Sequence, residues 1–133
     1  MIVPDASAIA LLFANSDVEP RATQAVTVLR ADTAWVVPEH WRAEVLSTVR
    51  RLTRGGKLEA KRASRAVEWL QRVTALTVPT ESVLPRMWEL RDNLSAYGAG
   101  YVAVAEAHDL TLVTADVRIA RADVARCSVR LVV

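Results

Sequence analysis

Short runs of apolar residues alternate along the chain with longer stretches in which apolar positions recur every three or four residues. The short runs are typical of buried strands, and the longer stretches are typical of amphipathic helices. The predicted strands cover residues 2–4, 34–38, 73–79, 111–116 and 129–133. The predicted helices cover residues 7–14, 18–31, 38–54, 58–73, 80–94 and 95–110, with one more before the last strand.

This order of elements, β-α-β-α-α-β-α-α-β-α-β, predicts an α/β fold. We expect a central, mostly parallel sheet of about five strands that is covered by helices on both faces. A chain of 133 residues suits a single domain, residues 1–133, with a hydrophobic core of its own. The dipeptide Gly55-Gly56 predicts the turn between two helices that return along each other.

The cysteine content and the N-terminal sequence indicate in which cellular compartment the protein is found. Cys127 is the only cysteine, so the chain has neither a disulfide framework nor a cysteine-based metal cluster, as suits a reducing compartment. The first residues, MIVPDAS, lack the basic and apolar regions of a secretion signal, and no apolar run is long enough to span a membrane. We therefore expect a cytoplasmic protein.

Charge is distributed unevenly, although the formal net charge is only +2. Residues 50–72 contain eight basic and two acidic side chains, which leaves the rest of the chain net negative. A basic segment beside an acidic body suits a polyanion that must approach an acidic site. A solvated helical hairpin without a ligand is the alternative. The basic residues are Arg50, Arg51, Arg54, Lys57, Lys61, Arg62, Arg65 and Arg72.

Two carboxylates follow predicted strands, and a third lies on the helix after the second strand. Asp5 and Asp116 would project from the same carboxyl edge of a parallel sheet, where open α/β sheets bind ligands. Glu44 lies at the margin of an apolar helix stripe and can lean into a crevice. Converging carboxylates repel one another unless a cation joins them, and their oxygens suit Mg²⁺ or Mn²⁺. We therefore expect a metal site capable of phosphodiester cleavage, the alternative being that the aspartates only cap turns.

Several neighbouring side chains are weaker candidates. Ser7 and Thr114 each lie two residues from one of these aspartates and could support the metal ligands by hydrogen bonds, or could cap the adjoining helices. His40 precedes Glu44 by four residues, but this segment lacks the second histidine of a zinc-binding helix. We expect His108 at the C-terminal end of its helix.

The four tryptophans could stack on nucleic-acid bases. The helical spacing of Leu84, Met87, Trp88 and Arg91 instead favours packing in the core or in a dimer. The tryptophans are Trp35, Trp41, Trp69 and Trp88.

The segment IVPDASAI carries Asp5, the segment VVPEHWRAEVLSTVRR carries Glu44, and LSAYGAGYVAVAEAHDLTLVTADVRIAR ends shortly after Asp116. In this order and spacing they resemble the four motifs of one family, the PIN-domain ribonuclease toxins of the VapC type. The resemblance covers essentially the whole chain. Single motifs of this kind are common, whereas four in order are specific.

The resemblance implies a Rossmann-like PIN fold and a Mg²⁺- or Mn²⁺-dependent endoribonuclease, which is a hydrolase. It also implies a homodimer and an antitoxin of the VapB type whose tail covers the acidic site. Asp5 and Asp116 would be metal ligands, and Glu44 would bind a second ion or position the attacking water. The residues expected to guide RNA phosphates are Arg50, Arg51, Arg54 and Lys57.

The third motif departs from the family pattern. An aspartate normally follows its tyrosine, whereas Gly98 follows Tyr97 in this chain. The predicted helix starts at Ser95, and a glycine in its first turn gives up the stabilisation that an acid gains there. Because an acid that holds metal is missing, we expect feeble metal binding and little or no cleavage.

Two explanations of Gly98 stay open. One is a single-nucleotide change from an aspartate codon that spares the producing cell a toxic enzyme, and the local helix energetics favour it. The other is a family member that has become a non-catalytic module binding an antitoxin or RNA. A dinucleotide-binding or phosphoryl-transfer domain is disfavoured, because the only glycines, Gly55, Gly56, Gly98 and Gly100, cannot form a phosphate-binding loop.

Overall fold

A computed structural model describes the whole chain, residues 1–133. The strands are β1 (Ile2–Pro4), β2 (Val36–Pro38), β3 (Leu76–Val78), β4 (Thr111–Thr114) and β5 (Val129–Leu131). The helices are α1 (Ala6–Ala10), α2 (Arg21–Ala31), α3 (Trp41–Arg54), α4 (Ala60–Arg72), α5 (Thr80–Glu89), α6 (Ala96–Ala107) and α7 (Val117–Ala122). One turn of 3-10 helix (Leu11–Phe13) follows α1. The predicted order of elements is confirmed, except that two α-helices, α1 and α2, lie between the first two strands where the predicted order has one.

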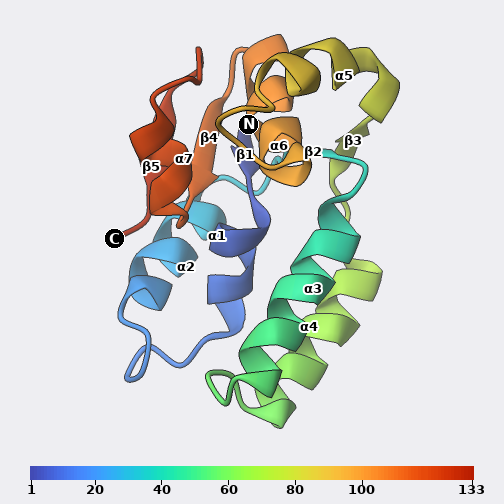
Figure 1. Ribbon diagram of the computed structural model, residues 1–133. Coiled ribbons are helices and arrows are strands. Elements are labelled where there is room, and N and C mark those ends of the chain that lie inside the picture. The colour runs from blue at the N-terminus through green and yellow to red at the C-terminus, as the bar shows by residue number, and fades with distance from the viewer.

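The strands are all parallel and lie side by side in the centre of the molecule (Figure 1). β4 pairs with β1 and with β5, while β2 pairs with β3. One parallel bridge between Ile2 and Trp35 joins the two sheets, which gives the spatial order β3-β2-β1-β4-β5. The strand order therefore reverses between β1 and β4, and open α/β sheets bind their ligands at such a point.

Helices cover both faces of this sheet. α6 packs across β1, β2 and β4, whereas α1 packs against β4 and α3. This division follows from right-handed crossovers, because the chain steps from β1 to β3 in one direction and then returns to β4. α3 and α4 form a long hairpin that extends away from the sheet (Figure 1). At its tip Gly55 caps α3 and Gly56 has a φ of 72°, so the predicted glycine turn is confirmed.

The largest fully buried side chains come from both layers of helices and from the strands. They include Trp41 of α3, Tyr101 of α6, Leu29 of α2 and Leu112 of β4. None of the helices combines the length and the apolar character needed to cross a membrane.

Some details of the sequence-based prediction are wrong. Pro38 ends β2 and does not open α3, which starts at Trp41. Of the two packing alternatives for Trp88, the core is wrong, because its side chain is 67% exposed, and packing in a dimer stays a prediction. The face that α5 buries consists of Val83 and Leu90, with Met87 half-buried, so the apolar stripe lies one residue earlier in the helix than Trp88 requires.

Candidate active site

A cleft of about 490 Å³ opens at the carboxyl edge of the sheet, beside the point where the strand order reverses. Its walls come from α3 and from the N-terminal ends of α1, α6 and α7, which are distant from one another in the sequence. The three predicted acids line this single cleft together with two arginines and with Gly98, the residue at which the third motif departs from the family pattern. These lining residues are Asp5, Glu44, Gly98, Asp116, Arg51 and Arg118.

Asp5 lies deepest among the acids, with an exposed fraction of 4%. It caps α1, and its Oδ1 accepts hydrogen bonds from the Ala8 amide at 3.0 Å and from the Ser7 hydroxyl at 2.6 Å. Thr114 Oγ1 donates to its second oxygen, Oδ2. Burial raises the pKa of Asp5, while the hydrogen bonds from Ser7 and Thr114 oppose this rise.

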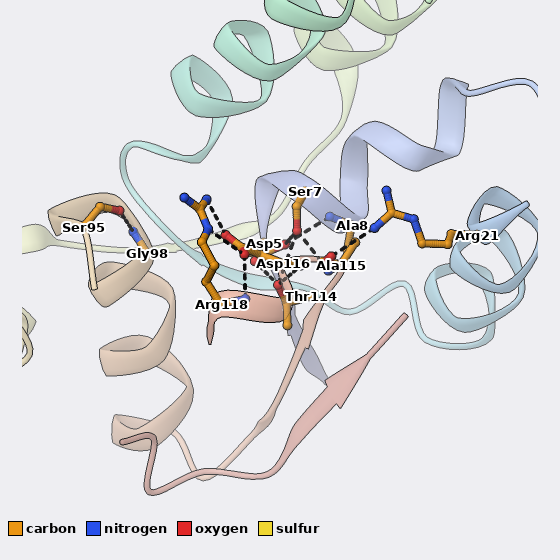
Figure 2. A network of polar contacts seen from close by, with 10 residues as sticks. All are labelled: Asp5, Ser7, Ala8, Arg21, Ser95, Gly98, Thr114, Ala115, Asp116 and Arg118. Atoms are coloured by element: carbon orange, nitrogen blue, oxygen red, sulfur yellow. Dashed lines mark hydrogen bonds and ion pairs between the residues drawn. The ribbon is translucent and has the colours of Figure 1, made fainter. Parts of the chain in front are cut away.

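Ser7 and Thr114 connect the ends of β1 and β4 (Figure 2). Ser7 Oγ accepts a hydrogen bond from the Ala115 amide at 2.9 Å, and Thr114 Oγ1 accepts one from the Asp116 amide at 3.0 Å. Each hydroxyl thus donates to Asp5 and accepts from the backbone that leads to Asp116. The two hydroxyl groups therefore fix the direction in which the Asp5 carboxylate faces the cleft.

Asp116 caps α7, where its Oδ1 accepts from the Arg118 amide at 2.9 Å. The Arg118 guanidinium also binds this carboxylate with both arms, Nε to Oδ1 at 3.0 Å and Nη2 to Oδ2 at 2.9 Å. These hydrogen bonds lower the pKa of Asp116. Sequence reasoning missed Arg118, although a basic side chain two residues after a helix cap is the available signal.

Glu44 approaches the cleft from the first turn of α3. Burial, and next the negative charge of Asp5, raise the pKa of Glu44 to about 7. Its Oε2 is buried without a hydrogen-bond partner, and so is the Tyr101 hydroxyl, whose pKa burial and Glu44 also raise. Unpartnered buried polar atoms are rare in proteins, and an ion, a water molecule or a catalytic role accounts for many of them.

His40 lies in the same wall of the cleft, between the rings of Tyr97 and Tyr101, whose centroids are 5.1 and 5.4 Å away. Its Nε2 donates to the Tyr97 carbonyl at 3.1 Å and lies 3.6 Å from Glu44 Oε2. A β-carbon at Gly100 would come within 2.5 Å of His40 Cε1. Gly100 is therefore required by the imidazole that packs against it. His108, as predicted, ends α6 as its C-cap.

Gly98 stands in the first turn of α6, and its amide donates to Ser95 Oγ at 3.1 Å, so the predicted N-cap at Ser95 is confirmed. A β-carbon at this position would meet only Ser95 Oγ at 3.4 Å and Ile119 Cδ1 at 3.8 Å. These are ordinary van der Waals distances. No steric constraint therefore demands glycine at residue 98, and a longer side chain has room to enter the cleft.

The donor set of the cleft fits a hard divalent cation, because it consists of carboxylate oxygens and includes the unpartnered Oε2 of Glu44. However, no three His, Cys, Asp or Glu side chains are arranged so that they already hold one ion. In addition, Arg118 binds the carboxylate of Asp116, and residue 98 provides no acid.

The other residues singled out in the sequence lie in different places. Of the basic residues expected to contact RNA, Arg51 lines the cleft, whereas Arg50, Arg54 and Lys57 are exposed along the hairpin toward its tip (Figure 1). Among the tryptophans, Trp35 and Trp41 are buried in the core, and Trp69 packs on Phe13 and Trp35. Trp88 is exposed, and the Cζ atom of Arg91 lies over its ring, 4.5 Å from the ring centroid.

Comparison with known proteins places this geometry in a family. The PIN domain family matches residues 2–125 of the chain. The chain is 37% identical over 132 residues to VapC ribonuclease Mb0985 of Mycobacterium bovis and to ribonuclease VapC9 of Mycobacterium tuberculosis, covering 99% of this chain and 98% of each relative. The chain belongs to the VapC-type PIN-domain family. Ribonuclease VapC3 of Mycobacterium tuberculosis is 38% identical over 121 residues, covering 91% of this PIN domain and 86% of the relative.

Solved structures share the fold of this VapC-type protein. The crystal structure of PAE2754 from Pyrobaculum aerophilum matches with a TM-score of 0.62 and 23% identity, over 96% of this chain and 81% of that one. Mycobacterium tuberculosis VapC20, described as a toxin that cleaves the sarcin-ricin loop, matches with a TM-score of 0.66 and 19% identity, over 92% and 95%. The Rossmann-like PIN fold expected from the motifs is thereby confirmed.

Proposed function

We propose that the chain is the toxin of a toxin-antitoxin pair and a Mg²⁺- or Mn²⁺-dependent endoribonuclease, impaired because Gly98 replaces a metal-binding acid. The observation that carries the proposal is the convergence of Asp5, Glu44 and Asp116 from three separate elements on one cleft at the β1–β4 edge. The names of its VapC relatives, which describe them as ribonucleases, support RNA as the substrate.

Within this cleft, Asp5 and Asp116 would hold the cation, and Glu44 would bind a second ion or position the attacking water. A divalent cation bound there supplies an activated water and stabilises the leaving oxygen of a phosphodiester. Ser7 and Thr114 keep both oxygens of Asp5 oriented, which is the usual role of hydrogen bonds to a metal ligand. Without a cation, burial and the charge of Asp5 raise the pKa of Glu44 to about 7, and a bound cation would lower it, which would leave a carboxylate that can orient water.

The hairpin of α3 and α4 would deliver the RNA to this cleft. Arg51 projects into the cleft, and Arg50, Arg54 and Lys57 continue the positive charge along exposed surface toward the hairpin tip. Such a track attracts phosphates independently of sequence and makes binding sensitive to salt. The acids at the cleft would otherwise repel the RNA backbone.

The family also suggests partners for this protein. We expect a VapB-type antitoxin that covers the acidic cleft, a homodimer, and action in the cytoplasm. The antitoxin would need to neutralise or occupy the same acids that bind the cation, so its binding should compete with Mn²⁺.

The impairment is tested by restoring the acid. We expect Gly98→Asp to bind Mn²⁺ at least ~10-fold more tightly in calorimetry, since losing even an outer hydrogen-bond partner of a metal ligand costs about 10–100-fold. Gly98→Asn is the matched control, because it has the same shape without the charge and should resemble the unmodified chain. Equal affinities of the Asp and Asn variants would reject the coordination argument.

The nuclease activity itself is tested with the same restored variant. Gly98→Asp should cleave RNA in the presence of Mn²⁺, and Asp5→Ala in that background should abolish cleavage. Sequencing of RNA ends after brief expression would identify the substrate and the cut site. If Gly98→Asp binds an antitoxin peptide or RNA but never cleaves, the alternative of a non-catalytic binding module is supported, and Gly98 is the observation that favours it.

A further inference from the structure

Each of the two outer acids of the cleft has an arginine opposite it. The positive charge of Arg51 acts on Glu44, and Arg118 binds Asp116 directly. Both arginines line the cleft together with the acids. The cleft therefore contains its own cations close to the oxygens that the proposed function assigns to a metal ion.

The contact between Arg118 and Asp116 is well aligned but open to solvent. Two guanidinium nitrogens face two carboxylate oxygens, which is the fork geometry that arginine forms with carboxylates and with phosphates alike. The Arg118 side chain is 86% exposed and has no other hydrogen-bond partner in the structure. Exposed pairs of this kind are weak and exchange readily for another partner.

The Arg118 side chain extends from α7 across the cleft. In the view of Figure 2 the Arg118 guanidinium lies between Asp116 and Gly98, and all three residues line the cleft. Arg118 and Gly98 therefore line the same cleft, although no Arg118 atom lies within 4 Å of where a β-carbon at residue 98 would stand. A cation that binds Asp116 must displace this guanidinium, and the released arginine remains at the cleft mouth.

We infer that Arg118 is a positioning residue with two alternating partners, Asp116 in the empty cleft and an RNA phosphate once a divalent cation takes Asp116. This inference rests on the proposed function, because it assigns Asp116 to the cation. Arg118 lies within the last of the quoted motif segments but was not among the site residues expected from the sequence.

The exchange predicts a coupling between the two ligands. When Mn²⁺ binds first, it breaks the Arg118–Asp116 pair, and RNA then meets a free guanidinium. When RNA binds first, it removes the guanidinium from Asp116 and leaves that carboxylate open to Mn²⁺. Because coupling is reciprocal, each ligand should tighten the binding of the other by the same factor.

The affinity for Mn²⁺ alone is measured by calorimetry in the Gly98→Asp background, where the proposed function predicts that Mn²⁺ binding is measurable. Arg118→Gln should tighten Mn²⁺ binding by about two- to fivefold, the range that an exposed ion pair accounts for. Arg121→Gln removes the same charge from an exposed position on α7 and should leave the affinity within error. An unchanged affinity in Arg118→Gln would overturn the inference.

RNA binding is measured in the Gly98→Asp background, where the proposed function predicts Mn²⁺ binding, and in its Arg118 variants. The probe for fluorescence anisotropy is a labelled phosphorothioate oligoribonucleotide, which keeps the negative charge of the phosphates and resists hydrolysis by water. Arg118→Gln should weaken binding in Mn²⁺ by more than in EDTA, and Arg118→Lys should restore part of the loss. A purely structural role at the start of α7 would weaken binding equally in both buffers, and that result would refute the exchange.

Failure of the inference and failure of the proposed function give different results. If Gly98→Asp binds no Mn²⁺, the proposed function fails and the exchange fails with it. If Gly98→Asp binds Mn²⁺ but the Arg118 variants behave as Arg121→Gln does, only the inference fails. Circular dichroism of each variant shows that α7 and the rest of the fold are retained.

Discussion

Two glycines of α6 have opposite surroundings and should respond oppositely to alanine. A β-carbon at Gly98 meets only ordinary contacts, at 3.4 Å and beyond, whereas one at Gly100 would lie 2.5 Å from the Cε1 atom of His40. Both residues lie within the helix, so the gain in helix propensity from the new methyl group is about 0.5–1 kcal/mol at either position. The two variants therefore differ mainly in the cost of the contact with His40.

The size of this difference follows from the packing of the imidazole. His40 is held between Tyr97 and Tyr101 and hydrogen-bonds to the Tyr97 carbonyl, so it cannot move aside without losing these contacts. Extra methyl groups in a well-packed site cost about 1–3 kcal/mol. We therefore expect Gly98→Ala to stabilise the fold by up to ~1 kcal/mol and Gly100→Ala to be less stable than Gly98→Ala by about 1–3 kcal/mol.

The assay is urea unfolding in EDTA, followed by far-UV circular dichroism, which gives the free energy of unfolding for each variant. His40→Ala provides the internal test, because it removes the ring that the new methyl group meets. In that background Gly100→Ala should become stabilising, with a coupling energy of about 1–3 kcal/mol in the double-mutant cycle. Equal stability of the Gly98→Ala and Gly100→Ala variants, or a coupling near zero, would refute the reasoning.

Three further predictions concern other side chains. Because the pKa of Glu44 is raised from 4.5 to about 7, the folded state retains a proton that the unfolded chain loses, and stability in EDTA should fall by about 3 kcal/mol as pH rises through this window. Glu44→Gln should flatten that slope in urea titrations, and an unchanged slope would contradict the assignment. Thr114→Val removes the buried donor to Asp5 and should cost about 1–3 kcal/mol by chemical unfolding, with Thr114→Ser retaining most of the stability. Trp88→Ala, on an exposed ring, should change stability by less than about 0.5 kcal/mol, whereas Trp41→Ala in the core should cost about 3–5 kcal/mol.

The convergence of acids on the sheet edge could be predicted from the sequence because it depends only on topology. Asp5 follows one strand and Asp116 another, and parallel strands end at the same edge. That rule needs no knowledge of side-chain conformation. The order of helices and strands was equally accessible, since apolar periodicity and glycine turns are local signals.

Contacts between side chains could not be predicted in the same way. Gly100 looks in the sequence like an ordinary small residue in a helix, and only the packing of α6 against the start of α3 shows that His40 requires it. The sequence of α5 has apolar residues on two adjacent sides. The side that packs on α6 carries Val83, and Trp88 lies on the exposed side. The pairing of Arg118 with Asp116 likewise depends on a side-chain conformation that spacing alone does not determine.

The cleft is less negative than its number of acids implies, and this bears on how residue 98 acts. The pKa of Glu44 is raised to about 7, and the charge of Asp116 is balanced by Arg118. These two acids therefore attract a divalent cation less than two free carboxylates would. An acid at residue 98 would add a ligand and could also compete with Asp116 for the guanidinium of Arg118, which lines the same cleft. On the proposed function, a single carboxylate there would therefore open two coordination positions, and Gly98→Asp should raise the affinity for Mn²⁺ by more than one added ligand alone.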